Sequence, residues 1–155
     1  QVLVGSSFGG WLSLMAALDR PEKVAALVLI APAVDMTERL MWARFSDAAR
    51  TTLMQDGIYH DPSDYDPQGY PITRALIEDG RAHLMLDKPI DINLPLRILH
   101  GQKDDAVPWE LSLELAAQLT GKDVEMHFIK HGDHRLSERH EIDRLIQLID
   151  SLSLQ

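Results

Sequence analysis

The hydrophobic pattern of the chain alternates between short apolar runs and longer runs with helical spacing. The short runs are typical of buried β-strands, and residues 23–31 are apolar on both alternating faces, as in a central parallel strand. The longer runs predict amphipathic helices. The predicted strands lie at residues 2–4, 23–31, 94–99 and 124–129, and the predicted helices at residues 10–19, 108–119 and 138–152. This order predicts an α/β fold with a mostly parallel sheet flanked by helices.

A long segment without a convincing strand interrupts this alternation. Helical spacing recurs at residues 36–54 and 72–86, whereas residues 60–71 are rich in Pro, Asp and Gly and predict an irregular excursion. Long insertions within compact domains usually serve as lids or binding elements. We therefore predict an inserted helical cap. The resulting organisation is core, cap and core, at residues 1–33, 34–93 and 94–155.

Composition and charge restrict the possible partners. The chain has 155 residues, of which 45% are hydrophobic and 25% charged, as in an ordinary globular protein of about one domain. Its net charge of −9 argues against binding to nucleic acid or to an anionic membrane surface. The absence of cysteine excludes disulfides, thiolate catalysis and cysteine-ligated zinc. No apolar run is long enough to span a bilayer, so we predict no membrane span.

A candidate nucleophile lies in Gly5-Ser6-Ser7-Phe8-Gly9, between the first predicted strand and the first predicted helix. Gly-x-Ser-x-Gly in this setting is the sequence form of a nucleophile elbow, which holds Ser7 on a sharp, strained turn. We expect glycine at both flanking positions because side chains there would collide with the turn. The turn also places the Phe8 backbone N–H at a helix start, where it can stabilise an oxyanion. The alternative is a Gly/Ser-rich turn without chemistry, and Ser6 is the wrong serine by register.

Candidates for the other members of a serine triad follow the last two predicted strands. A serine needs a base to take its proton and a carboxylate to orient that base. Asp104 and Asp105 follow the third predicted strand, and His131 and His134 follow the fourth. The order serine, acid, histidine is that of the fold that carries the elbow. Side chains at the carboxyl ends of parallel strands converge in the crevice where such sheets bind ligands.

The remaining polar groups near these loops have simpler interpretations. His100 ends the third predicted strand and is interpreted as packed or hydrogen-bonded beneath the site. His131, Asp133 and His134 lack the further ligand that a metal site would need. We therefore predict no metal and no cofactor.

Several segments of the chain resemble serine hydrolases of the α/β-hydrolase superfamily. LHGQKDDAVP resembles the HGxxDxxVP signature around the acid, which selects Asp104 over Asp105, and HGDH resembles the histidine loop, which selects His134 over His131. Further likeness is to the mitochondrial enzymes that remove palmitoyl groups from cysteine or hydrolyse acyl glucuronides, and to their bacterial relatives. It is carried by VGSSFGGWLSL, ALIEDGRAHLML, PIDINLPLRILHG, DDAVPWE and KHGDHR.

The resemblance implies a serine hydrolase that cleaves carboxylic esters or thioesters through an acyl-enzyme intermediate. Its triad would be Ser7, Asp104 and His134, with the Phe8 N–H as one oxyanion-hole donor. The partner would be a small-molecule acyl ester or thioester, and the expected location is cytoplasmic. Two alternatives stay open: an amide or peptide hydrolase using the same triad, and a non-catalytic ligand-binding protein or inactive fragment that retains the fold.

The resemblance also implies that the chain is the C-terminal part of such a fold, starting at the nucleophile strand. We expect the second oxyanion-hole donor upstream of Gln1, because a loop after an earlier strand supplies it in this fold. Loss of one such donor costs about 100–1000-fold in rate, and an uncovered apolar edge strand promotes association. We therefore expect residues 1–155 alone to be poorly soluble or weakly active.

Overall fold

Two units divide the chain, one formed by Gln1–Val34 with Met85–Gln155 and the other by Asp35–Leu84. The computed structural model describes residues 1–62 and 67–152. The first unit carries every strand predicted from the sequence. The second unit lies within residues 34–93, where the cap is predicted, and a covering role for it stays a prediction.

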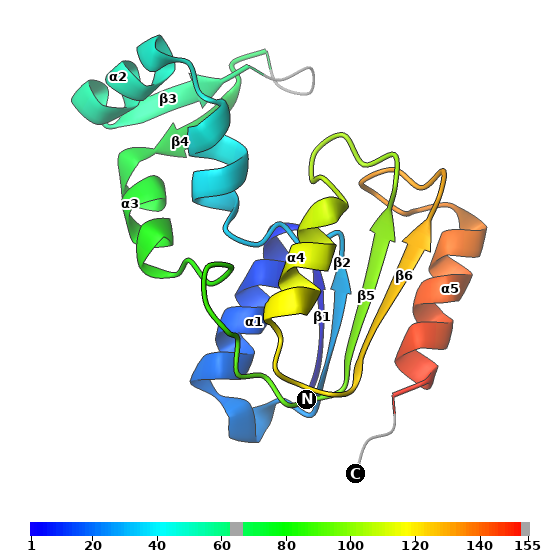
Figure 1. Cartoon of the computed structure of the whole chain (residues 1–155). Helices are drawn as coiled ribbons and strands as arrows, with labels where there is room; N and C mark the ends of the chain where they lie inside the picture. The colour runs from blue at the N-terminus through cyan, green and yellow to red at the C-terminus, as the bar shows by residue number, and fades with distance from the viewer. Residues whose placement is uncertain (63–66, 153–155) are drawn as a thin grey trace. The chain divides into compact units, whose positions relative to one another are not determined.

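The first unit is built on a four-stranded parallel sheet in the order β1-β2-β5-β6. Its strands are β1 (Val2–Ser6), β2 (Ala26–Ile30), β5 (Leu96–Gly101) and β6 (Val124–Ile129). The α/β class and the parallel sheet predicted from the sequence are confirmed. Because all four strands run in the same direction, their carboxyl ends lie along one edge of the sheet (Figure 1).

The burial of each strand follows its position in the sheet. All of β5 and all of β2 except Ile30 are buried, because these two strands have neighbours on both sides. β1 and β6 are the edge strands of the described sheet, and Val4 in β1 is 49% exposed. The contrast explains why the apolar run of β2 is continuous in the sequence, since both of its faces pack inside the unit.

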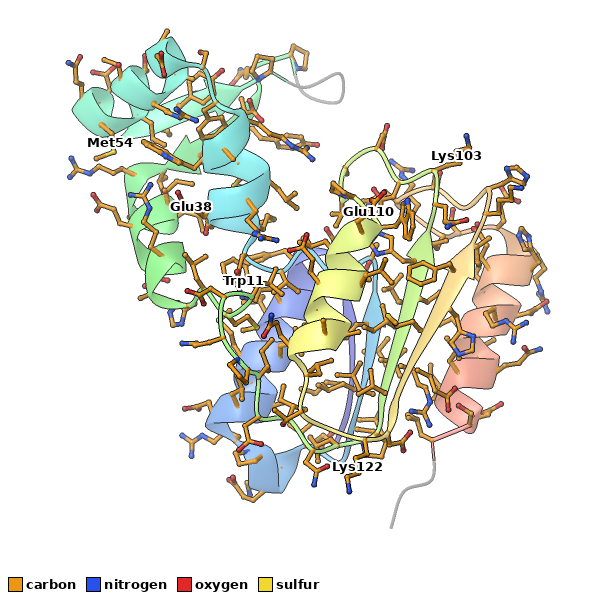
Figure 2. The ribbon with its side chains drawn as sticks, viewed as in Figure 1. Trp11, Glu38, Met54, Lys103, Glu110 and Lys122 are labelled. Atoms are coloured by element: carbon orange, nitrogen blue, oxygen red, sulfur yellow. The ribbon has the colours of Figure 1, made fainter. Side chains whose placement is uncertain are left out.

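Three α-helices accompany this sheet (Figure 1). α1 (Phe8–Asp19) and the short 3₁₀ turn η1 (Pro21–Lys23) join β1 to β2, α4 (Glu110–Gln118) joins β5 to β6, and α5 (Arg139–Asp150) follows β6. Each helix places apolar side chains in the core, as the helical spacing predicts. Buried examples are Trp11 (labelled in Figure 2) and Leu14 of α1, Leu115 of α4 and Leu148 of α5.

The second unit contains a two-stranded antiparallel sheet that the sequence did not predict. β3 (Ile58–Asp61) pairs with β4 (Tyr70–Thr73), with Tyr59 opposite Ile72. The expectation of a strand-free cap with an irregular excursion at residues 60–71 is therefore wrong where it overlaps these strands; residues 63–66 lie outside the described residues. Pro71 obscured the signal, but an isolated pair has only edge strands, and an edge tolerates a residue without an N–H.

The predicted helix at residues 36–54 is also wrong in detail, because the chain breaks it into three pieces. A π-helical turn, η2 (Thr37–Met41), leads into a 3₁₀ turn, η3 (Trp42–Arg44), and then into α2 (Asp47–Asp56). The break falls at Ser46, which has an extended backbone and accepts a hydrogen bond from Ala49 N–H with its side chain. Serine favours such a helix cap over a helix interior.

The last helix of the second unit, α3 (Arg74–Ala82), lies within the helix predicted at residues 72–86. Thr73 caps it by accepting a hydrogen bond from the Leu76 N–H. Gly80 lets α3 approach η2 closely, since a Cβ there would lie 2.1 Å from Thr37 Oγ1. The unit also buries an apolar cluster of its own, formed by Phe45, Ala49, Leu53, Ile72 and Ile77.

Candidate active site

Ser7 lies on a strained turn between β1 and α1. Its backbone angles are φ 53° and ψ −120°, a region that residues with a side chain rarely adopt. Backbone hydrogen bonds hold the turn, because Ser7 N–H donates to Ile30 O at 2.8 Å and Ser7 O accepts from Gly10 N–H and Ala33 N–H at 2.9 and 3.0 Å. This is the geometry that the elbow motif predicts. The bond to Ile30 also ties the turn to the end of β2.

The glycines around the turn differ in what they contribute. A Cβ at Gly5 would lie 2.3 Å from Gly9 O, and a Cβ at Gly10 would lie 2.8 Å from Pro32 Cβ. Both positions therefore require glycine for close packing. The expectation that Gly9 is needed for the same reason is wrong for the described residues. Apart from its two chain neighbours and the nearby backbone of α1, no described atom lies within 4 Å of a Cβ at this position.

Ser7, His134 and Asp104 form one hydrogen-bonded chain. His134 Nε2 lies 3.0 Å from Ser7 Oγ, and His134 Nδ1 lies 2.7 Å from Asp104 Oδ2. The three residues follow β1, β6 and β5, so the carboxyl edge of the sheet brings them together. The Asp104 side chain is fully buried, whereas 27% of the His134 side chain is exposed. The structure thus places His134 in contact with both Ser7 and Asp104, inside a single unit.

The neighbouring candidates lie differently. Asp105 and His131 are both exposed on the loops that carry Asp104 and His134. Within residues 1–62 and 67–152, neither makes a hydrogen bond or ion pair with the Ser7 chain of contacts. Spacing along the chain does not distinguish Asp104 from Asp105 or His134 from His131. The resemblance selects Asp104 and His134, and these are the two residues that the structure joins by a hydrogen bond.

Four hydrogen bonds hold the Asp104 carboxylate in place. Oδ1 accepts from the backbone N–H groups of Ala106 and Val107 at 2.9 and 2.8 Å. Oδ2 lies 2.7 Å from His134 Nδ1 and 3.2 Å from His100 Nε2. Burial alone would raise the pKa of Asp104, but the hydrogen bonds from His100, His134 and Val107 outweigh it and hold the pKa well below its ordinary value. Asp104 is therefore ionised throughout the neutral range.

The loops after β5 and β6 are fastened to each other. Lys103, labelled in Figure 2 in the loop that follows β5, donates its backbone N–H to Gly132 O at 2.9 Å. Gly101 and Gly132 approach so closely that a Cβ at Gly101 would lie 2.2 Å from Gly132 O. Asp133 Oδ1 accepts from the backbone N–H of Leu136 at 3.1 Å and shapes the histidine loop. The acid and the histidine are thus carried on one rigid pair of loops.

The surroundings of His134 favour its protonated form. The hydrogen bond to Asp104 is the largest influence and raises the pKa of His134 above its ordinary value of 6.5. Burial acts in the opposite direction, and the charges of Asp104, Asp105 and Asp133 reinforce the increase. An imidazolium at this position is consequently stabilised when the ring takes a proton from Ser7.

This pKa predicts the acid limb of a pH–rate profile. We expect kcat/KM to rise with pH through an ionisation centred above 6.5, because His134 must be neutral to accept the Ser7 proton. Asp105→Asn should move this limb to lower pH, since it removes one negative charge near the ring. The measurement is kcat/KM across pH for the full-length protein and the variant. A limb centred at or below 6.5, or an upward shift in the variant, would contradict this assignment.

The first residue of α1 is the candidate oxyanion-hole donor. Phe8 begins the helix, and the first N–H groups of a helix have no acceptor within it. The positive end of the helix dipole adds to the attraction for a developing negative charge. Phe8 directly follows the candidate nucleophile at the start of α1, and its role as an oxyanion-hole donor stays a prediction.

Two observations bear on metals and membranes. Among the described residues, no group of three or more metal-ligating side chains is close enough to hold an ion. None of the helices in the described part of the chain combines the length and the apolar character needed to cross a bilayer.

One contact in the site exceeds what the sequence indicated. The sequence indicates that His100 is packed or hydrogen-bonded beneath the site, and the structure adds that its ring directly contacts the Asp104 carboxylate. The signal was the separation of four residues between His100 and Asp104. A turn closes between them, in which Asp104 N–H donates to Gly101 O at 3.3 Å.

Comparisons with known proteins agree with this geometry. The model of the prolyl oligopeptidase family matches residues 1–151. The human mitochondrial palmitoyl-protein thioesterase ABHD10 is 40% identical over 153 residues, covering 98% of this chain and 50% of the relative. The chain thus spans about half the length of the curated relatives that it matches.

Two solved structures are similar over nearly the whole chain. A crystal structure of an Agrobacterium vitis S4 protein has a TM-score of 0.91 and 38% identity, with 97% of this chain and 60% of that chain covered. Mouse α/β-hydrolase domain-containing protein 10 has a TM-score of 0.84 and 41% identity, with the same two shares, 97% and 60%. The similarity includes the second unit as well as the sheet.

Proposed function

The chain belongs to the prolyl oligopeptidase family and has an α/β-hydrolase fold. We propose that it cleaves carboxylic esters or thioesters by serine acyl transfer. The observation that carries the proposal is the hydrogen-bonded chain from Ser7 Oγ through His134 to Asp104. A strained turn presents the hydroxyl, a ring with a raised pKa faces it, and a buried carboxylate fixes the ring.

The proposed reaction has two steps that use the same three side chains. His134 Nε2 accepts the Ser7 proton as Ser7 Oγ attacks the acyl carbonyl, and the Phe8 N–H stabilises the oxyanion. His134 then gives the proton to the leaving alcohol or thiol, which departs from the acyl-enzyme. Water, deprotonated by His134, attacks the acyl carbon; the bond from that carbon to Ser7 Oγ breaks, His134 returns the proton to Ser7 Oγ, and the acid is released. Asp104 keeps the proton of the neutral ring on Nδ1 and stabilises the imidazolium in both steps.

The relatives support an acyl thioester or ester as the substrate class. Five mammalian relatives are named palmitoyl-protein thioesterases, with identities of 39–42% to this chain. We propose a small molecule or modified residue that carries an acyl chain as the partner. The cytoplasmic location expected from the sequence stays a prediction, and the names of these relatives place them in mitochondria.

The family name favours a second candidate function, which is hydrolysis of peptide bonds by the same triad. The chemistry at Ser7 would be the same, but the leaving group would be an amine. A non-catalytic ligand-binding protein or an inactive fragment is the third candidate, and it would retain the fold without turnover.

A panel of substrates with one acyl group separates these candidates. We expect the full-length protein to hydrolyse an acyl ester and an acyl thioester much faster than the matching amide, because alcohols and thiols leave more readily than amines. The measurement is kcat/KM for each member, with the acyl chain varied in length. Turnover of peptides in preference to esters would support the peptidase, and no turnover together with no reaction with a fluorophosphonate would support the binding protein.

A further inference from the structure

A fully buried histidine that the proposed reaction does not use lies against the acid of the triad. The His100 side chain is 0% exposed, at the end of β5. Its Nε2 is 3.2 Å from Asp104 Oδ2 and 3.1 Å from Val107 O, and its Nδ1 is 2.7 Å from Ser112 Oγ in α4. Each polar atom of the ring therefore has a partner, and one of those partners is the catalytic carboxylate.

These contacts determine where the proton of the ring lies. The two neighbours of Nε2 are a carboxylate and a carbonyl oxygen, which can only accept, so Nε2 must carry a proton that they share. Nδ1 faces a hydroxyl, which can donate to it when the ring is neutral. Ser112 is itself fully buried, so no water competes for this bond. The ring is thus held with its Nε2–H directed at the carboxylate.

The arrangement around Asp104 assigns separate tasks to its two oxygens. Oδ1 is occupied by the Ala106 and Val107 N–H groups, which belong to its own loop. Oδ2 receives the His100 N–H from the strand and the His134 N–H from the neighbouring loop. Without His100, His134 would be the only side chain among the described residues that holds Oδ2, and its protonation changes during the reaction.

We propose that His100 is a positioning residue that orients the Asp104 carboxylate toward His134 through its Nε2–H. This inference rests on the proposed function, because it assigns a role within the same triad. His100 touches neither Ser7 nor the reacting atoms in this arrangement. It acts through Asp104, so its loss should lower turnover without changing how substrate binds.

Two amide replacements distinguish the two ends of the ring. Glutamine places its amide nitrogen about where the histidine Nε2 lies and can still donate to Asp104. Asparagine is shorter and reaches only the position of Nδ1, next to Ser112. We expect His100→Asn to lower kcat about 10-fold with KM changed less than about 2-fold, and His100→Gln to stay within about 3-fold of the wild-type kcat.

The full-length protein and an ester substrate provide the assay, with thermal unfolding to verify that each variant is folded. In an Asp104→Asn background, His100→Asn should cause little further loss, because residues that act through one another are not additive. The proposal would be overturned if His100→Asn and His100→Gln lowered kcat equally, or if neither lowered it. It would also be overturned if His100→Asn lowered kcat as much in the Asp104→Asn background as in the wild type.

A measurement on the unmodified protein keeps the proposal testable if a variant does not fold. Nitrogen-15 NMR of the histidine rings should show a proton on Nε2 of His100, and a neutral ring protonated only on Nδ1 would overturn the role. The two proposals fail separately. Hydrolysis that does not depend on Ser7 would overturn the proposed function, whereas full activity of His100→Asn in a Ser7-dependent enzyme would overturn only the role of His100.

Discussion

Replacing Ser7 with alanine is expected to lower kcat by roughly 10⁶-fold and to abolish labelling by a fluorophosphonate probe. The variant removes the atom that attacks the acyl carbon in the first step of the proposed reaction and forms the acyl-enzyme. It leaves the strained turn, the Phe8 N–H and the His134–Asp104 pair in place, so weak residual catalysis over water should persist. The measurements are ester hydrolysis and gel detection of the labelled full-length protein.

Ser6→Ala is the matched control for this prediction. Ser6 is the last residue of β1 and pairs with Ile30 in the sheet, one position before the turn. It has the same chemistry as Ser7 but not the backbone geometry or the contact with His134. We expect the control to keep both labelling and turnover. Labelling that survives in Ser7→Ala and disappears in Ser6→Ala would show that the nucleophile is wrongly assigned.

Replacing Asp104 with asparagine is expected to lower kcat by roughly 10⁴-fold with the protein still folded. The backbone N–H groups of Ala106 and Val107 will hold the amide oxygen of the new side chain at the Oδ1 position. Its NH₂ group then takes the place of Oδ2 and faces His134 Nδ1, while the His100 Nε2–H keeps Val107 O as its acceptor. That nitrogen must become an acceptor, so the ring proton moves to Nε2 and points at Ser7 Oγ. The base can no longer accept the serine proton.

Asp105→Asn is the control for the acid, since it removes the same charge one residue along the loop. Its side chain is exposed. On the alkaline plateau of the pH profile we expect its kcat to stay within a few-fold of wild type. A comparable loss in both variants would mean that charge near the loop matters, rather than the hydrogen bond to His134.

The sheet and the elbow could be predicted from the sequence because both are local patterns. The strand β2, buried on both faces, is apolar at every position, and a nucleophile turn must have glycine where the backbone closes on itself, as at Gly5. The second unit gave weaker signals. The four-residue strands β3 and β4 are too short for alternation to stand out, and Ser46 breaks a helix whose apolar spacing continues past it.

The membership of the triad was only partly determined by the sequence. The loops after β5 and β6 each offered two candidates, and the difference between Asp104 and Asp105 is the direction in which one loop turns. That direction depends on hydrogen bonds between loops, such as Lys103 to Gly132, which have no periodic signature. The contact of His100 with Asp104 depends in the same way on the fully buried Ser112, contributed by α4.

β2 lies between the strand that carries the nucleophile and the strands that carry the acid and the histidine. Acid and histidine sit together on the fastened loops of β5 and β6, whereas the nucleophile stands on β1, with β2 as a spacer between them. The parallel backbone ladders that pair β2 with β1 and with β5, together with the Ser7 N–H bond to Ile30 O, set the width of that spacer. Because these ladders fix the spacing of the strands, engineering aimed at the Ser–His distance should change the turn that carries Ser7 or the loop that carries His134, and leave β2 intact.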